Sequence, residues 1–223
     1  MQVHSNPVPS RFPAAAVLPL PAAAGAPVGT VLTLRKGKEL FTEGDDADCF
    51  YKVVSGAIRS YKLLSDGRRQ IDAFHLPGDI FGLEAGEEHR FSAEAVGTAT
   101  VVAWRRSRLQ ALMAEDGGFR DQVMTAMLRS LERAQDHMLL LGRKTAQEKV
   151  ATFLLEMAER IADDEAQFDL PMLRNDIADH LGLTIETVSR TLNQFDRDGL
   201  IRLPAASRSV VLRDRAALER LNA

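Results

Sequence analysis

The chain has 223 residues, of which 45% are hydrophobic, enough to bury one or two ordinary cores. The formal net charge is −3 at pH 7, so any basic surface must be a local patch. A single cysteine excludes an internal disulfide framework, and no apolar run approaches the ~20 residues of a membrane-spanning helix. These properties predict a soluble, cytoplasmic protein that does not enter a membrane.

The N-terminal segment, residues 1–27, is rich in alanine and proline and contains one arginine and no lysine. Its prolines interrupt the apolar residues, so the segment does not have the continuous apolar region of a signal peptide. We expect a disordered tail that precedes the folded domains.

Residues 28–115 form the first predicted domain, in which short alternating runs are separated by glycine and other turn residues. Asp66-Gly67 is a strong hairpin signal between two of these runs. Many short strands at regular spacing are typical of a barrel or jelly roll. The predicted strands are residues 31–34, 50–54, 57–64, 70–74 and 94–104.

Residues 116–142 are predicted to form a long helix followed by a hinge. Along it, six residues recur at spacings of 3, 4, 3, 4 and 3, an unbroken a/d seam over about 2.5 heptads. The seam residues are Met124, Met127, Leu131, Ala134, Met138 and Leu141. A single seam predicts a parallel homodimer, and the alternative is a stripe that packs within its own protomer. Val123, Leu128 and Leu139 lie off the seam and are expected to pack against the strands.

Residues 143–223 are predicted to form a winged helix-turn-helix domain. The hinge is expected at Gly142, Arg143 and Lys144. Thr145-x-x-Glu148 then forms a capping box that begins the first helix of this domain, residues 146–161.

Between residues 170 and 201 the chain reads LPMLRNDIADHLGLTIETVSRTLNQFDRDGLI. The spacing of its apolar residues predicts helices over 174–181 and 185–197, joined by a turn that contains Gly182. Thr184 is a good N-cap for the second helix. In a helix-turn-helix motif this second helix enters the major groove of DNA.

The outward face of the second helix carries polar residues within its first two turns. Arginine binds guanine O6 and N7 and glutamate accepts from cytosine N4, so Glu186 and Arg190 would read neighbouring bases or one G·C pair. The alternative is a surface helix whose Glu186 and Arg190 form a solvated ion pair. Two short apolar runs after the helix, residues 200–203 and 209–212, predict a wing with Arg208 available to phosphates.

Two runs in the first domain, GKELFTEGDDADCFYKVVSGAIRSYK and LPGDIFG, resemble the cyclic-nucleotide-binding β-roll. Together with LGLTIETVSR they resemble the CRP/FNR superfamily of bacterial transcription regulators, over nearly the whole chain after the tail. The E-x-x-S-R pattern of Glu186, Ser189 and Arg190 resembles the FNR/FixK branch, and FixK-type regulators in particular. The resemblance implies an α+β fold with an N-terminal cyclic-nucleotide-binding-like β-roll, a long dimerisation helix and a C-terminal winged helix-turn-helix.

FixK-type regulators generally bind TTGA-type inverted repeats. The resemblance implies that Glu186 and Arg190 contact the G·C pair of each half-site, while Ser189 helps with the neighbouring T·A pairs. The residues expected to contact phosphates are Arg174, Asn175, Thr184, Thr187 and Arg208. We therefore expect a sequence-specific DNA-binding transcription regulator that acts as a homodimer and an activator, with double-stranded DNA and RNA polymerase as partners.

The ligand site departs from the pattern of the cyclic-nucleotide binders. Those proteins hold the ribose with a glutamate just after the second glycine of the PGD-x-x-G turn, and the phosphate with an arginine followed by serine or threonine. Here Leu83 follows Gly82, and Phe91 stands where the arginine should be. Glu84 and Arg90 are present but displaced, so we expect neither cyclic nucleotide nor any other cofactor.

The chain also lacks the residues for the metal centres that relatives use. The oxygen-sensing branch holds an iron–sulfur cluster with four cysteines, and this chain has only Cys49. The aspartates beside Cys49 should raise its thiol pKa, which favours a packed residue over a redox switch. The histidines show no metal-ligand spacing, although haem ligation by His75 or His89 is an alternative.

Other function classes are less well supported by the sequence. An enzyme is not expected, because the chain has no P-loop, no G-x-S-x-G and no H-E-x-x-H. A winged helix that binds proteins instead of DNA would not need the polar face of Glu186, Ser189 and Arg190. A ligand-gated or redox-gated member of the same superfamily is the remaining alternative.

Overall fold

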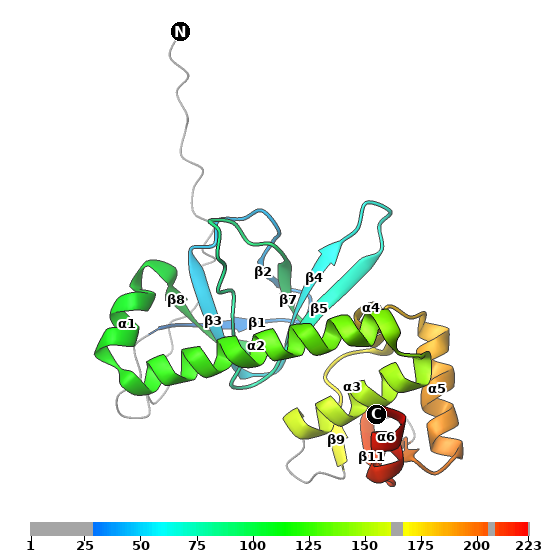
Figure 1. Cartoon of the computed structure of the whole chain (residues 1–223). Coiled ribbons are helices and arrows are strands. Elements are labelled where there is room, and N and C mark those ends of the chain that lie inside the picture. Colours follow the sequence, from blue (N-terminus) through cyan, green and yellow to red (C-terminus); the bar gives the residue numbers. More distant parts are fainter. Residues whose placement is uncertain (1–28, 162–166, 205–207, 223) are drawn as a thin grey trace.

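The structure, a computed structural model, describes residues 29–161, 167–204 and 208–222. The predicted tail and the tip of the predicted wing, residues 205–207, lie outside the described residues. Figure 1 shows a strand-rich domain and a helical domain, with one long helix, α2, running along both. In the described ranges, no helix has the length and apolarity needed to cross a membrane.

The strand-rich domain is a β-roll of two antiparallel four-stranded sheets, with strand orders β1-β8-β3-β6 and β2-β7-β4-β5. Along β8 buried residues alternate with partly exposed ones, so the apolar side chains meet between the sheets. The strands are β1 (Thr30–Leu34), β2 (Glu39–Phe41), β3 (Cys49–Ser55), β4 (Ile58–Leu63), β5 (Arg69–His75), β6 (Ile80–Phe81), β7 (Ser92–Ala95) and β8 (Ala99–Arg105).

The predicted strand over 94–104 is wrong, because the structure divides this segment into β7 and β8. β7 pairs with β2 and β4, whereas β8 pairs with β1 and β3, so the chain changes sheets between Ala95 and Ala99. Ala93, Ala95, Ala99 and Val101 are all fully buried and occupy alternate positions on both sides of the break, although Val96, which is also buried, and Gly97 interrupt the alternation. Because both strands keep the same alternate positions, the pattern predicts one strand where the chain changes sheets.

After the β-roll come a 3-10 turn, η1 (Arg106–Arg108), and α1 (Leu109–Glu115), followed by α2 (Gly117–Arg143). The side chain of Asp116 caps α2 by accepting a hydrogen bond from the Phe119 amide at 3.0 Å. The helix continues through the expected hinge residues Gly142 and Arg143, and only Lys144 is extended. The linker between α2 and α3 is therefore Lys144 and Thr145, and Lys144 is the one predicted hinge residue that lies in it.

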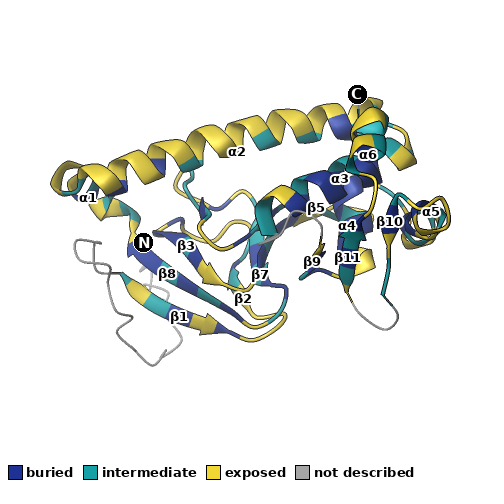
Figure 2. Ribbon diagram, turned by 90° about the horizontal axis from the view of Figure 1, so that it is seen from below, coloured by how far each residue is buried: buried dark blue, intermediate teal, exposed yellow. Residues whose placement is uncertain are grey.

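Only one of the three apolar residues expected to lie on the strand-facing side of α2 is found there. Val123 is fully buried in a cluster with Phe50 and Trp104 of the β-roll. Leu128 and Leu139 are 59% and 63% exposed, so the prediction was wrong for both. Helix geometry places them about 140° and 160° around the axis from Val123. Figure 2 shows that most of the length of α2 is exposed.

In its described residues, the helical domain combines four helices with a three-stranded sheet, in the order β10-β11-β9. The predicted capping box at its start is confirmed: the Thr145 amide donates to Glu148 Oε2 at 2.6 Å, and the Glu148 amide donates to Thr145 Oγ1 at 3.4 Å. The elements are α3 (Ala146–Ile161), β9 (Gln167–Asp169), α4 (Arg174–Leu181), α5 (Ile185–Arg197), β10 (Ile201–Arg202), β11 (Ser209–Leu212) and α6 (Arg215–Asn222). This arrangement confirms the expected α+β fold.

Candidate DNA-binding interface and dimerisation surface

The turn between α4 and α5 follows from local sequence. Gly182 ends α4 in the left-handed conformation, with φ of 61°, which glycine adopts without steric cost. Two residues later, Thr184 Oγ1 accepts from the Thr187 amide at 3.2 Å and so caps α5, as predicted. The two threonine hydroxyls are also 3.1 Å apart. Both predicted phosphate contacts in this turn are thus already part of the helix cap.

Helix α5 buries one face and leaves the opposite face in solvent. Val188, Leu192 and Phe195 are buried in the domain core. Glu186 and Arg190 are exposed, and Ser189 is partly exposed between them. Figure 1 places α5 at the outer edge of the helical domain, beyond α4 as seen from the β-roll.

The alternative of an i,i+4 ion pair on this helix is not observed. Across the described parts of the chain, no hydrogen bond or ion pair engages Glu186 or Arg190, and both side chains are exposed. Their polar groups are therefore available to an external partner. This is the geometry that a recognition helix needs to reach base edges.

The other predicted phosphate contacts lie beside α4. Arg174 and Asn175 are exposed in its first turn, where helix amides also point outward. Arg208, at the described end of the wing, donates from Nη1 to the Pro171 carbonyl oxygen at 2.8 Å, and its own carbonyl accepts from the Leu170 amide at 3.1 Å. These bonds hold the base of the wing next to the segment that leads into α4.

The seam of α2 is exposed along most of its length. Leu131 is 56% exposed and Met138 is 68% exposed, and the seam residues before and between them are exposed as well. Leu141 is half-buried and packs against the core of the helical domain, close to Gly182. The rest of the seam therefore does not pack within its own protomer. An exposed apolar row of this kind marks a protein contact surface.

Aromatic rings meet inside the β-roll. The ring of His89 stacks on Phe41 at 3.5 Å between centroids, and Tyr51 lies 5.6 Å from Phe41 and 5.5 Å from Phe81. Burial lowers the pKa of His89, whose Nδ1 lies 3.6 Å from Glu84 Oε1. These aromatic side chains do not supply the cation that a phosphate requires.

The two residues that depart from the nucleotide-binding pattern are also engaged in packing. Leu83 packs against the cluster of the β-roll and α2, and the Lys62 ammonium lies 5.9 Å from the centroid of the Phe91 ring. The displaced Glu84 accepts a hydrogen bond from the Arg90 amide at 3.4 Å. The Glu84 carboxylate is thus bound to the backbone of its own loop.

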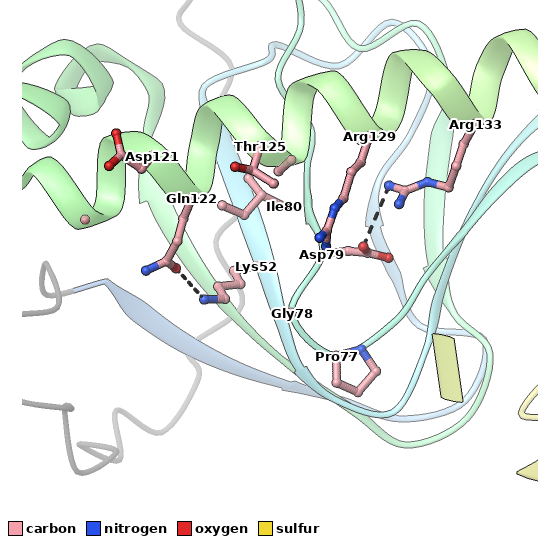
Figure 3. A pocket seen from close by; sticks show the side chains of 12 residues that line it. Lys52, Pro77, Gly78, Asp79, Ile80, Asp121, Gln122, Thr125, Arg129 and Arg133 are labelled. Atoms are coloured by element: carbon pink, nitrogen blue, oxygen red, sulfur yellow. Dashed lines mark hydrogen bonds and ion pairs between the residues drawn. The ribbon is translucent and has the colours of Figure 1, made fainter. Parts of the chain in front are cut away.

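A groove of about 450 Å³ lies elsewhere, between α2 and the turn that precedes β6 (Figure 3). Two of its charged groups have partners: Arg133 is 3.7 Å from Asp79, and Lys52 Nζ donates to Gln122 Oε1 at 2.9 Å. The lining carries charges of both signs, with Asp79 and Asp121 beside the basic side chains, which does not favour a phosphate.

The remaining candidates for redox or metal chemistry have packing roles. Cys49 is 5% exposed, and its thiol pKa is raised, as expected, although burial is the main cause and Asp48 contributes less. His75 Nε2 lies 3.1 Å from Ser60 Oγ, and its ring stacks on Phe81 at 4.3 Å. Within residues 29–161, 167–204 and 208–222, no group of three or more His, Cys, Asp or Glu side chains could hold a metal ion.

Comparison with known proteins agrees with this geometry. Residues 148–221 match the family model of the Crp-like helix-turn-helix domain, and residues 31–116 match that of the cyclic nucleotide-binding domain. The nitrogen fixation regulation protein FixK of Azorhizobium caulinodans is 47% identical to this chain, over 99% of this chain and 93% of that protein. The chain belongs to the CRP/FNR superfamily, in its FixK-like branch.

Other members of the superfamily support the same assignment. The solved structure of FixK2 from Bradyrhizobium japonicum has a TM-score of 0.81 and 50% identity, covering 88% of this chain and 98% of that one. The transcriptional activator protein Anr of Pseudomonas protegens is 40% identical over 75% of this chain and 71% of its own length. The FixK-like protein described here is therefore a DNA-binding transcription regulator and not an enzyme.

Proposed function

We propose that this regulator binds TTGA-type inverted repeats as a homodimer in the cytoplasm and activates transcription through contact with RNA polymerase. The observation that carries the proposal is the exposed pair Glu186 and Arg190 on α5, which has no partner among the described residues. Guanine and cytosine edges would supply the missing partners in one G·C pair of each half-site. Relatives such as Anr are named transcriptional activators.

The homodimer is supported by the exposed seam on α2, which includes Leu131 and Met138. Parallel packing of two such helices would place two copies of α5 on the same side of the dimer. Two recognition helices about 34 Å apart meet successive major grooves on one side of the duplex, which matches an inverted repeat. Each half-site adds affinity because the second binding event is intramolecular.

We further propose that DNA binding needs no cyclic nucleotide. A cyclic phosphate requires a cation within hydrogen-bonding distance, whereas Phe91 stands at the expected position of the arginine and aromatic rings meet inside the roll. A ligand shifts a conformational equilibrium only through its different affinity for the two states, so a nucleotide that does not bind shifts nothing.

The test is a gel-shift titration of purified full-length protein with three duplexes: a TTGA inverted repeat, the same repeat with the G·C pairs exchanged for A·T, and a single half-site. We expect nanomolar binding to the intact repeat without added ligand, and a loss of at least tenfold for each altered duplex. Equal binding to all three would refute sequence-specific recognition and favour a winged helix that contacts proteins.

Cyclic AMP and cyclic GMP are then titrated into the protein by calorimetry, and the gel shift is repeated at saturating nucleotide. We expect no heat of binding and unchanged DNA affinity. Micromolar binding together with a tenfold or larger gain in DNA affinity would refute the ligand-independent part of the proposal and leave sequence recognition intact.

A further inference from the structure

Helix α4 has two faces with different surroundings. Arg174 and Asn175 in its first turn are exposed, whereas Asp176, the next residue, is 2% exposed and faces the β-roll. Asp176 Oδ1 accepts from Arg59 Nη1 at 2.6 Å and from Arg69 Nη2 at 2.7 Å. Its Oδ2 accepts from the Leu173 amide at 3.2 Å. One carboxylate thus caps the helix that leads to the DNA and binds two arginines of the other domain.

The cluster continues on both sides of Asp176. One turn further along α4, Asp179 Oδ2 accepts from Arg69 Nε at 2.9 Å. On β7, Glu94 Oε1 accepts from Arg59 Nε at 2.8 Å and Nη2 at 2.5 Å. Asp176 and Asp179 are three residues apart, so both carboxylates lie on the same face of the helix. The guanidinium forks of Arg59 and Arg69 therefore join three carboxylates from two domains.

Neighbouring contacts between the two domains surround this cluster. Arg160 of α3 donates to the Phe74 carbonyl oxygen on β5 at 2.7 Å, and Gln70 of β5 donates from Nε2 to the His180 carbonyl oxygen at 3.1 Å. Ile71 of β5 is buried in the same apolar cluster as the core of the helical domain. Charges buried in such a contact remain favourable only in good geometry, so the geometry itself is strongly specified.

We propose that Arg59 and Arg69 are positioning residues for DNA binding: through Asp176 and Asp179 they hold α4, and with it α5, at one angle to the β-roll. In a homodimer this angle sets the separation of the two recognition helices. The inference rests on the proposed binding of an inverted repeat. It also gives a physical reason why no small molecule would be needed, because the protomer already fixes the arrangement that a ligand would otherwise select.

The test compares inverted repeats whose spacer is optimal, one base pair shorter and one base pair longer. The wild-type protein should discriminate strongly among them, because a fixed separation matches one spacing. The Arg59→Gln/Arg69→Gln variant should bind the optimal spacer about tenfold more weakly, because the angle between its two domains must be fixed when it binds. Its affinity for the shorter and longer spacers should change little. The preference within each half-site and the salt dependence should not change, because no DNA contact is removed.

Arg68→Gln is the matched control. Arg68 lies on the same hairpin, and its side chain is 77% exposed and pairs with Asp66. It should retain wild-type spacer discrimination. If the double variant fails to fold, Asp179→Asn replaces it, because Asp179 is the most exposed of the three carboxylates and its loss leaves Asp176 paired. A folded variant that loses affinity equally for all spacers would overturn the positioning role.

A second measurement needs no DNA. Cys49→Ser/Lys36→Cys/Asn193→Cys places spin labels on exposed positions of the β-roll and α5, and an excess of unlabelled protein ensures that each labelled protomer reports its own distance. We expect one narrow distance distribution, which broadens with Arg59→Gln/Arg69→Gln. A broad distance distribution in the wild-type protein would overturn the positioning role of Arg59 and Arg69. A narrow distance distribution in a protein that does not bind an inverted repeat would refute the proposed function but support the positioning role of Arg59 and Arg69.

Discussion

Helices α2 and α5 both present a row of exposed side chains, but the two rows are chemically opposite. The row on α2 is the apolar seam, with Leu131 56% exposed and Met138 68% exposed, whereas the row on α5 is Glu186 and Arg190. Burying an apolar surface against any other apolar surface is favourable. Burying a polar surface is favourable only where hydrogen-bond partners replace the water that it loses. The first row therefore indicates a second protein copy, and the second row indicates base edges.

The buried residues of the two helices explain why α2, and not α5, is left with a row of uncovered apolar side chains. Helix α5 has already placed its apolar residues, such as Leu192 and Phe195, in the core of its own domain. Helix α2 buries Phe119 and Val123 near its start and Leu140 near its end, which leaves the apolar side chains between them uncovered. A partner protein would therefore stabilise α2, whereas DNA would add contacts to a helix that is already stable.

The largest effect is expected on the seam of α2. Leu131→Glu/Met138→Glu would bury two like charges across the dimer axis without partners, at a cost of several kcal/mol each. Analytical ultracentrifugation should find monomers, and binding to the inverted repeat should fall to the level of a single half-site. A variant that remains dimeric would move the interface to another surface.

Two neighbouring residues sharpen this test. Met138 is on the seam and Leu139 is off it, although they are 68% and 63% exposed. Met138→Glu alone should weaken the dimer, whereas Leu139→Glu should not. Equal weakening would show that overall hydrophobicity, and not the heptad pattern, determines association.

The next effect is expected on the polar row. Arg190→Ala should cost about 1–3 kcal/mol per half-site and relax the preference for guanine, because a bidentate contact is lost. Arg197→Ala, at the other end of α5, is the matched control and should keep the preference. Competition gel shifts with base-substituted half-sites measure both. An unchanged preference in Arg190→Ala would mean that another face of α5 contacts the bases.

A smaller effect is expected where α2 meets α4, because the rings of His137 on α2 and His180 on α4 stack there with 4.2 Å between their centroids. Burial lowers the pKa of His180 from 6.5 to about 3, with His137 adding to the shift. Between pH 6.5 and about 3 the His180 side chain is protonated in the unfolded chain but not in the folded protein. The free energy of unfolding should therefore decrease as the pH is lowered from 6.5 to about 3. The slope for one such proton is about 1.4 kcal/mol per pH unit.

Urea unfolding of the wild type and His180→Gln across this range measures the slope. Glutamine does not titrate and retains a donor for the Ile71 carbonyl oxygen, which lies 3.1 Å from His180 Nδ1. The variant should be less stable at pH 7 but show a shallower pH dependence. Parallel curves would place the acid sensitivity in other groups.

The smallest effect is expected for phosphate contacts beside the recognition helix. Arg174→Ala should weaken binding to every sequence and reduce the slope of log affinity against log salt by about one. Arg220→Ala, on the exposed side of α6, removes the same charge away from the motif and should leave the slope unchanged. A loss confined to TTGA sites would instead make Arg174 a base-reading residue.

Local features of the motif could be predicted from the sequence because each depends on residues a few positions apart. Thr184 caps α5 through an amide three residues away, and Gly182 ends α4 through its own φ angle. The seam of α2 and the exposed pair on α5 follow from helical period alone. The base and phosphate contacts assigned to these residues remain predictions, since they depend on DNA.

Tertiary structure decided what no local period encodes. The change of sheet between β7 and β8 was missed because the buried residues occupy the same alternate positions in both strands, on either side of Val96 and Gly97. The exposure of Leu128 and Leu139 follows from which side of α2 packs on the β-roll, which is the side that carries Val123. The binding of Asp176 by Arg59 and Arg69 joins residues 117 and 107 positions apart. Such ion pairs form only when two domains dock, so the orientation of the recognition helix is decided by the tertiary structure. The side chains that the helix exposes can be read from the sequence.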